Sequence, residues 1–100
     1  MNAAERLWRG LRRHDWEAVR AQFHPSAVIE DAGSGARRDV DEFIATQRVQ
    51  AARGEGEIEV LRCVVDGKTA VIEARVGDRR CAAIYDVHDG RIAGAVEYWA

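Results

Sequence analysis

Several residue types that carry recognisable chemistry are scarce in this chain. The 100 residues include two cysteines, three histidines and one proline. The histidines are scattered without paired spacing, and no His-Glu-x-x-His, Cys-x-x-Cys or glycine-rich phosphate loop occurs. We therefore expect neither a metal ion nor a bound cofactor.

A long apolar run is also missing. No N-terminal segment has the pattern of a signal peptide, and no segment is long enough to span a membrane. Cys63 and Cys81 both fall in apolar, strand-like patterns, which is typical of buried thiols in a cytoplasmic protein. We expect a cytoplasmic protein that does not bind membranes. A disulfide between Cys63 and Cys81 is possible only if their two strands are neighbours.

An excess of positive charge is absent as well. Fifteen basic residues stand against 17 acidic ones, so the net charge is −2 and nucleic acid is not an expected partner. A chain of this length forms one domain, which we place over residues 1–100. Such a domain buries a modest core, and oligomerisation would help to stabilise it.

The first half of the chain carries helical periodicity. Apolar residues recur at three- and four-residue spacing in three segments, and Asp15 and Asp39 stand where the second and third helices need N-caps. Pro25 and the residue before it end the second segment. The predicted helices cover residues 3–13, 16–23 and 40–52.

The second half changes to alternating, strand-like periodicity. Asp-Gly and Gly-Asp pairs separate the alternating segments, as in hairpin turns. An earlier short strand is predicted at 27–29, ending in Glu30-Asp31. The later strands are predicted at 57–65, 69–76, 80–87 and 91–99. The order ααβαββββ argues for an α+β fold with helices on one face of an antiparallel sheet.

Five motifs follow one another along the chain. They are His14-Asp15-Trp16-Glu17-Ala18, Phe23-His24-Pro25-Ser26-Ala27 with Glu30-Asp31, Arg38-Asp39-Val40 with Phe43, Asp89-Gly90-Arg91-Ile92, and Glu97-Tyr98-Trp99. Their order and spacing resemble the nuclear-transport-factor-2-like superfamily, in particular its SnoaL-like branch of polyketide cyclase and ketosteroid isomerase relatives. The resemblance implies a curved antiparallel sheet wrapped around the N-terminal helices as a cone, with an apolar pocket at the open end. It also implies a small apolar ligand and a homodimer formed through the sheet.

Asp31 is the first candidate for chemistry. By the resemblance it occupies the position where ketosteroid isomerase keeps its catalytic aspartate base. A carboxylate in apolar surroundings can take a proton from a carbon next to a carbonyl. The alternative is a strand-end cap without catalysis. The glycine-rich loop 33–38 follows, either as a solvated loop or as a lid whose Arg37 or Arg38 meets an anionic group of a ligand.

The resemblance also identifies a departure from the isomerase. That enzyme needs an oxyanion hole made by a tyrosine and a protonated aspartate. Here Leu7 and Trp8 fall at the tyrosine position and Ala83 at the aspartate position, and they cannot supply that pair of donors. Steroid-type isomerisation is therefore disfavoured, and these three residues are expected to line the ligand pocket.

The last two strands add further candidates. Glu97 shares strand parity with Trp99 and is expected to face the pocket as an acid, or else to lie on the dimer face. Tyr85 is a second candidate acid, because its hydroxyl could donate to a ligand carbonyl or simply reach the rim. Trp8 and Trp99 could stack on a flat ligand or fill the core.

These candidates lead to one function and one alternative. The first is a SnoaL-like small-molecule-binding protein, a cofactor-free isomerase or cyclase in which Asp31 is the general base and Tyr85 or Glu97 the acid. Its substrate would be a cyclic ketone or a polyketide-like molecule. The alternative is a non-catalytic homodimeric interaction or accessory module whose pocket is occluded by Trp8 and Trp99.

Overall fold

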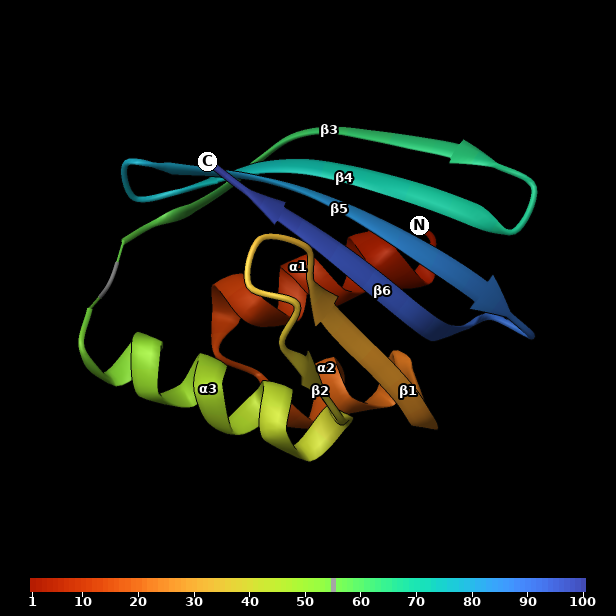
Figure 1. The fold of residues 1–100 in the computed structure, drawn as a ribbon, viewed down its shortest axis with the longest axis horizontal. Coiled ribbons are helices and arrows are strands. Elements are labelled where there is room, and N and C mark those ends of the chain that lie inside the picture. The colour runs from red at the N-terminus through yellow and green to blue at the C-terminus, as the bar shows by residue number, and fades with distance from the viewer. Residues whose placement is uncertain (55) are drawn as a thin grey trace.

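The computed structural model describes residues 1–54 and 56–100, and it shows helices packed on one side of a curved sheet (Figure 1). The elements are α1 (Ala3–Arg13), α2 (Trp16–Ala21), β1 (Phe23–Asp31), β2 (Arg37–Arg38), α3 (Val40–Ala52), β3 (Ile58–Asp66), β4 (Thr69–Val76), β5 (Arg79–His88) and β6 (Arg91–Trp99). The predicted order ααβαββββ is confirmed, with the short strand β2 added between β1 and α3.

The strands form one six-stranded sheet in the order β2-β1-β6-β5-β4-β3. The four strands β3 to β6 run as an antiparallel meander, as predicted. β1 instead lies parallel to β6, although the two are far apart in the sequence. This parallel pairing makes the sheet mixed and brings the end of β1 beside the end of β6.

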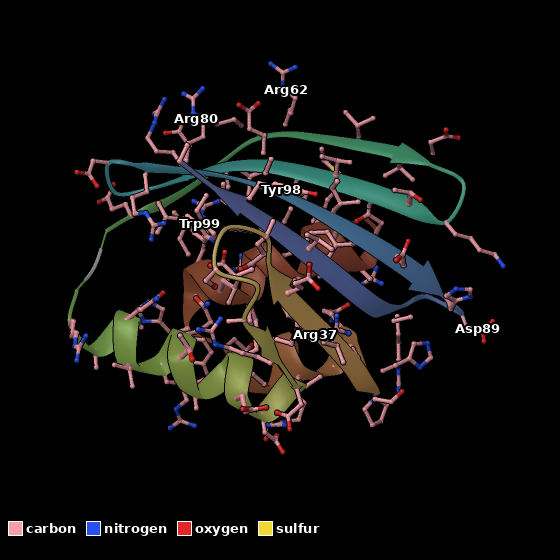
Figure 2. The ribbon with its side chains drawn as sticks, viewed as in Figure 1. Arg37, Arg62, Arg80, Asp89, Tyr98 and Trp99 are labelled. Atoms are coloured by element: carbon pink, nitrogen blue, oxygen red, sulfur yellow. The ribbon has the colours of Figure 1, made fainter. Side chains whose placement is uncertain are left out.

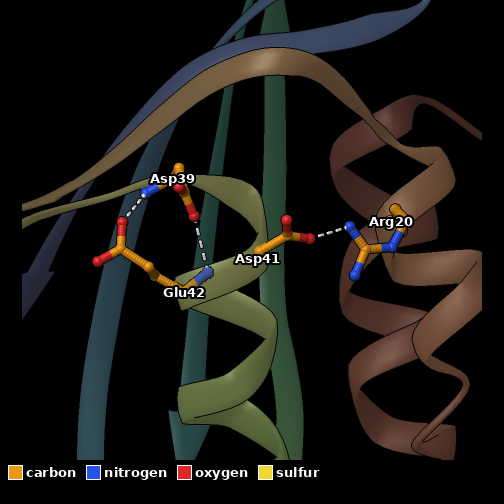
Figure 3. A network of polar contacts seen from close by, with 4 residues as sticks. All are labelled: Arg20, Asp39, Asp41 and Glu42. Carbon is orange, nitrogen blue, oxygen red and sulfur yellow. Dashed lines mark hydrogen bonds and ion pairs between the residues drawn. The ribbon is translucent and has the colours of Figure 1, made fainter.

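Local capping explains where α2 and α3 begin. Asp39 Oδ1 accepts a hydrogen bond from the Glu42 backbone N–H at 2.8 Å, and Glu42 Oε1 accepts from the Asp39 N–H at 3.0 Å (Figure 3). This is the predicted capping box, and it satisfies two backbone donors at the start of α3. Asp15 also caps α2 as predicted. An ion pair between Arg20 and Asp41 joins α2 to α3 at the surface.

Two predicted boundaries near Pro25 were wrong. Helix α2 ends at Ala21, and Phe23 already belongs to β1, which extends to Asp31 instead of covering only 27–29. Proline favours an extended conformation before it and lacks a backbone N–H. Accordingly, β1 continues through Pro25 while its pairing with β6 is interrupted between Phe23 and Val28.

The core lies between the helices and the inner face of the sheet. Its largest fully buried side chains are Leu7, Val19, Ile72, Cys81, Tyr85 and Ile92. Cys63 on β3 and Cys81 on β5 are free thiols, and β4 lies between their strands, so the disulfide does not form. Within the described ranges, no helix is both long and apolar enough to cross a membrane.

Candidate functional site

The register of the sheet brings together residues from opposite halves of the chain. Asp31 at the end of β1 is the partner of Glu97 on β6. Trp99 follows two residues later and therefore lies on the same inner face, since side chains alternate along a strand. On the other side of β6, the strand β5 places Ala83 opposite Glu97 and Cys81 opposite Trp99. The sheet thus places two carboxyl groups and one indole at one end of its inner face.

A cavity of about 410 Å³ opens at this end of the molecule. Residues from α3, from β1 and β2, from the turn between β4 and β5, and from the end of β6 line it. They are Asp31, Arg38, Phe43, Thr46, Gln47, Gln50, Gly56, Val76, Gly77, Asp78, Arg79, Glu97 and Trp99. Most of these side chains are polar or charged, so the lining is more polar than the apolar pocket that the sequence led us to expect.

Asp31 both caps a turn and faces the cavity. Its Oδ1 accepts hydrogen bonds from the backbone N–H groups of Gly33 at 2.9 Å and Ser34 at 3.2 Å. Oδ2 makes no side-chain or backbone hydrogen bond within the described ranges. The backbone N–H of Ala32 donates to the Glu97 carbonyl at 2.9 Å and fixes the turn against β6. One carboxylate oxygen therefore holds the loop, and the other is available to a ligand.

Glu97 is the buried acid of the site. The residue is 8% exposed, and its Oε1 accepts a hydrogen bond from Trp99 Nε1 at 3.3 Å. Burial raises the pKa of Glu97 above its usual range, and the neighbouring charge of Asp31 raises it further. The Trp99 hydrogen bond and the Arg38 guanidinium oppose that shift without cancelling it. Glu97 therefore holds a proton more readily than an exposed glutamate.

Replacing Glu97 with Gln should change how stability depends on pH. Because the pKa of Glu97 is raised in the folded state, its protonated form adds stability below the unfolded pKa, and this contribution is lost as pH rises through the folded value. Glutamine stays neutral over this range. The free energy of unfolding of the variant should therefore rise relative to that of the wild type by about 1.4 kcal/mol per pH unit within that window. Urea unfolding between pH 4 and 8 measures this difference. The exposed Glu59→Gln is the control, and parallel wild-type and Glu97→Gln curves would contradict the prediction.

Four of the predicted site residues lie in the core and do not line the cavity. Leu7, Trp8, Ala83 and Tyr85 are all at most 2% exposed and belong to the core. Trp8 Nε1 donates to the Tyr85 hydroxyl at 2.8 Å. Burial, followed by the nearby charge of Glu97, raises the pKa of Tyr85 well above its ordinary value. The structure thus separates a buried layer from the residues Asp31, Glu97 and Trp99 that contact the cavity.

Cys81 is protonated in this environment. The residue is fully buried, and burial together with the charge of Glu97 raises the pKa of its thiol to about 12. A thiol is a strong nucleophile only when it is ionised. Cys81 is therefore packed as a small apolar group beside the site.

Several cavity residues were not found from the sequence. Arg79 lies with its guanidinium carbon 4.6 Å from the centroid of the Trp99 ring, and Thr46, Gln47 and Gln50 face the cavity from α3. The spacing of these three polar residues on the helix was an available signal. Only the packing of α3 against the sheet shows that they point at the same space as Arg79.

The loop after β1 contributes one arginine to the site. Arg38 lines the cavity, whereas its neighbour Arg37 pairs with Glu30 at 2.9 Å on the other face of β1 and β2. The Asp31 backbone N–H donates to the Ala36 carbonyl, and the Gly35 N–H donates to the Asp31 carbonyl, each at 2.8 Å, and these two bonds close the loop. Figure 2 shows Trp99 beneath the end of the sheet, with Arg80 pointing away from the molecule on the outer side.

Comparisons with known proteins agree with this architecture. A family model for the SnoaL-like domain matches residues 4–95. A Sinorhizobium meliloti protein assigned as a polyketide cyclase is 27% identical, with a TM-score of 0.78 over 95% of this chain and 92% of its own. IdmH from Streptomyces antibioticus, also assigned as a polyketide cyclase, is 18% identical, with a TM-score of 0.83 over 97% and 88%. No curated protein matches the sequence significantly.

A protein assigned as a ketosteroid isomerase from Kribbella flavida is similar as well. It is 19% identical and has a TM-score of 0.78 over 98% of this chain and 75% of its own. The nuclear-transport-factor-2-like fold predicted from the sequence motifs is thereby confirmed.

Proposed function

Because this chain belongs to the family of SnoaL-like domains, we propose that it binds a small carbonyl compound in the cavity and moves protons on it without a cofactor. One observation carries the proposal: Asp31 and Glu97 are register partners on β1 and β6 and line the same cavity. Their environments differ, since Glu97 is buried and Asp31 is held by two backbone amides. Pairs of carboxyl groups in unlike environments are suited to act as acid and base.

The two groups have complementary roles in the proposed reaction. Oδ2 of Asp31 accepts a proton from the carbon next to a ketone, and the electrons of that C–H bond form the enol double bond. Glu97 gives its proton to the carbonyl oxygen, so that the product is a neutral enol. When the ketone has a β,γ double bond, the enol is a dienol, and transfer of the proton from Asp31 to its γ-carbon with return of the O–H proton to Glu97 gives the conjugated isomer. When the enol carbon instead attacks a second carbonyl, the ring closes, the O–H proton returns to Glu97 and the new alkoxide takes the proton from Asp31.

Glu97 is a better acid than Tyr85 in this geometry. Glu97 lines the cavity, whereas Tyr85 is 1% exposed and its hydroxyl accepts the Trp8 hydrogen bond. The cavity also favours the enzyme over the alternative of an occluded interaction module. Trp8 lies in the core, and Trp99 lines the open space instead of filling it.

The test is proton exchange on simple ketones in deuterated buffer. We expect the wild-type protein to accelerate deuterium incorporation next to the carbonyl of 2-tetralone or of a cyclohexenone, measured by NMR. Glu97→Gln should slow the exchange about 100-fold or more, because general acid–base catalysis contributes about 100- to 10,000-fold. Exchange no faster than in buffer across a panel of one- and two-ring ketones would contradict the proposal.

We further propose that the chain forms a homodimer through the outer face of the sheet. Val64, Val71, Ile84 and Val96 are consecutive register partners from β3 to β6, so they form one apolar row. Val64 is 54% exposed and Ile84 39% exposed, and Tyr98 is also exposed on this face (Figure 2). Val71 and Val96 are half-buried between these exposed residues. An apolar row of this kind is typical of an interaction surface.

Replacing Ile84 with Lys should disrupt that dimer. A charge at the centre of a dry interface loses its hydration, so we expect the dissociation constant to rise about 100-fold or more. Analytical ultracentrifugation over a range of protein concentrations measures it. Val49→Lys alters an apolar residue on α3 that is more exposed than Ile84, at 49%, and should leave the dimer intact. A wild-type protein that stays monomeric at 100 µM would contradict the proposal.

A further inference from the structure

Two arginine side chains line the cavity and form no ion pair with another residue that the structure describes. Arg38 on β2 is half-buried, and Arg79 on β5 lies over the Trp99 ring. Neither makes an ion pair with a residue in the ranges 1–54 and 56–100. Arg79 is exposed, so the arginines line an open cavity. Each guanidinium carries five N–H donors, and an arginine that faces such a cavity is suited to binding an anion.

The neighbouring arginines on the same two strands behave differently. Arg37 pairs with Glu30 at 2.9 Å, and Arg80 approaches Glu73 at 3.5 Å. These contacts lie on the outer face of the sheet, as the direction of Arg80 in Figure 2 shows. Because side chains alternate along a strand, the adjacent arginine in each case, Arg38 after Arg37 and Arg79 before Arg80, faces inward. Each strand therefore presents one arginine to an outer acid and one to the cavity.

We propose that the ligand of this cavity carries a carboxylate group, which Arg38 and Arg79 bind. The inference rests on the proposed function and narrows its substrate class to keto acids. A planar guanidinium matches the two oxygens of a carboxylate and forms charge-assisted hydrogen bonds with it. The Trp99 ring holds the Arg79 guanidinium at the cavity through a cation–π contact.

The charges around the cavity favour a carboxylate over a phosphate. Asp31 and Asp78 line the cavity and balance the two arginines, while the buried Glu97 adds no charge when it is protonated. Because these charges balance, the cavity has no net positive charge to offset the larger desolvation cost of a doubly charged phosphate, so a ligand with one negative charge is favoured. The hydroxyl and amide side chains that α3 presents can contact the neutral oxygens of the same ligand.

The experiment compares acids with their neutral amides. The probes are benzoate with benzamide, 2-naphthoate with 2-naphthamide, and 2-naphthyl phosphate, with binding followed by the NMR shift of the Trp99 indole N–H. We expect 2-naphthoate to bind about 10- to 100-fold more tightly than 2-naphthamide, since hydrogen bonds to charged groups are the stronger ones. Arg38→Gln and Arg79→Gln should each reduce this preference at least about tenfold. The matched outer variants Arg37→Gln and Arg80→Gln should keep it.

Each other outcome is decisive. If the amides bind as tightly as the acids, the carboxylate inference fails while the small-molecule cavity stands. Stronger binding of the phosphate than of the carboxylate overturns the preference for a single charge. Loss of the preference in Arg37→Gln or Arg80→Gln to the same extent shows an effect of overall charge, and overturns the inference. If no probe of either size binds, the inference fails together with the proposed ligand cavity.

Discussion

The Asp31→Asn variant is expected to exchange the protons next to a ketone about 100- to 10,000-fold more slowly than the wild type, because the amide cannot act as the base. The fold should survive the change. An asparagine oxygen can still accept the Gly33 and Ser34 N–H bonds that the carboxylate accepts now. Deuterium exchange by NMR gives the rate, and a thermal unfolding curve shows that the variant is folded.

A matched control separates the base from the general charge of the cavity. Asp78 is a second aspartate in the cavity wall, but it lies in the turn between β4 and β5, away from Glu97 in the sheet register. Asp78→Asn removes the same charge and should leave the exchange rate within about threefold of the wild type, because solvent screens an exposed side chain. An unchanged rate in Asp31→Asn, or an equal loss in Asp78→Asn, would show that Asp31 is not the base.

The second large effect is expected for stability. Trp8→Ala should lower the free energy of unfolding by about 3–5 kcal/mol, because it empties a large volume in the core and leaves the Tyr85 hydroxyl without its donor. Trp8 is 2% exposed, and its indole N–H is 2.8 Å from that hydroxyl. The free energy of unfolding of a whole domain is only about 5–15 kcal/mol, so the variant should be marginally stable. Urea unfolding followed by circular dichroism measures the difference.

Two controls identify the source of this loss. Trp16→Ala removes the same side chain from a half-buried position on α2, and should cost less because solvent already reaches it. Trp8→Phe retains an aromatic ring but deletes the N–H, so it should cost about 1–3 kcal/mol. If Trp8→Ala lowers the free energy of unfolding no more than Trp16→Ala does, the Trp8 indole does not stabilise the core as predicted.

The chain's local patterns were sufficient to predict most of its elements. The helices and the four-stranded meander follow from the spacing of apolar residues, and a capping box with Asp39 and Glu42 marks the start of α3. These signals act between residues close in sequence, so they can be found without a structure. The inward parity of Tyr85 and Glu97 was also predictable, because alternation within one strand is local.

Near Pro25 the same reasoning failed, for a physical reason. The spacing of apolar residues placed Phe23 in the last turn of the second helix. Pairing of that residue with Ile92 on β6 selects the strand. Such a long-range contact outweighs a weak local preference for helix. It cannot be predicted from the residues next to Phe23 in the sequence.

By itself, the sequence determined most of the elements, their order and the side of each strand that is apolar, because these depend on neighbouring residues. Only the tertiary structure decided that β1 lies parallel to β6, with Asp31 opposite Glu97. It also decided that Arg38 faces the cavity while Arg37 faces an acid on the outside. The register between distant strands and the burial that raises the pKa of Glu97 arise from the packing of the whole chain, and that packing makes the site.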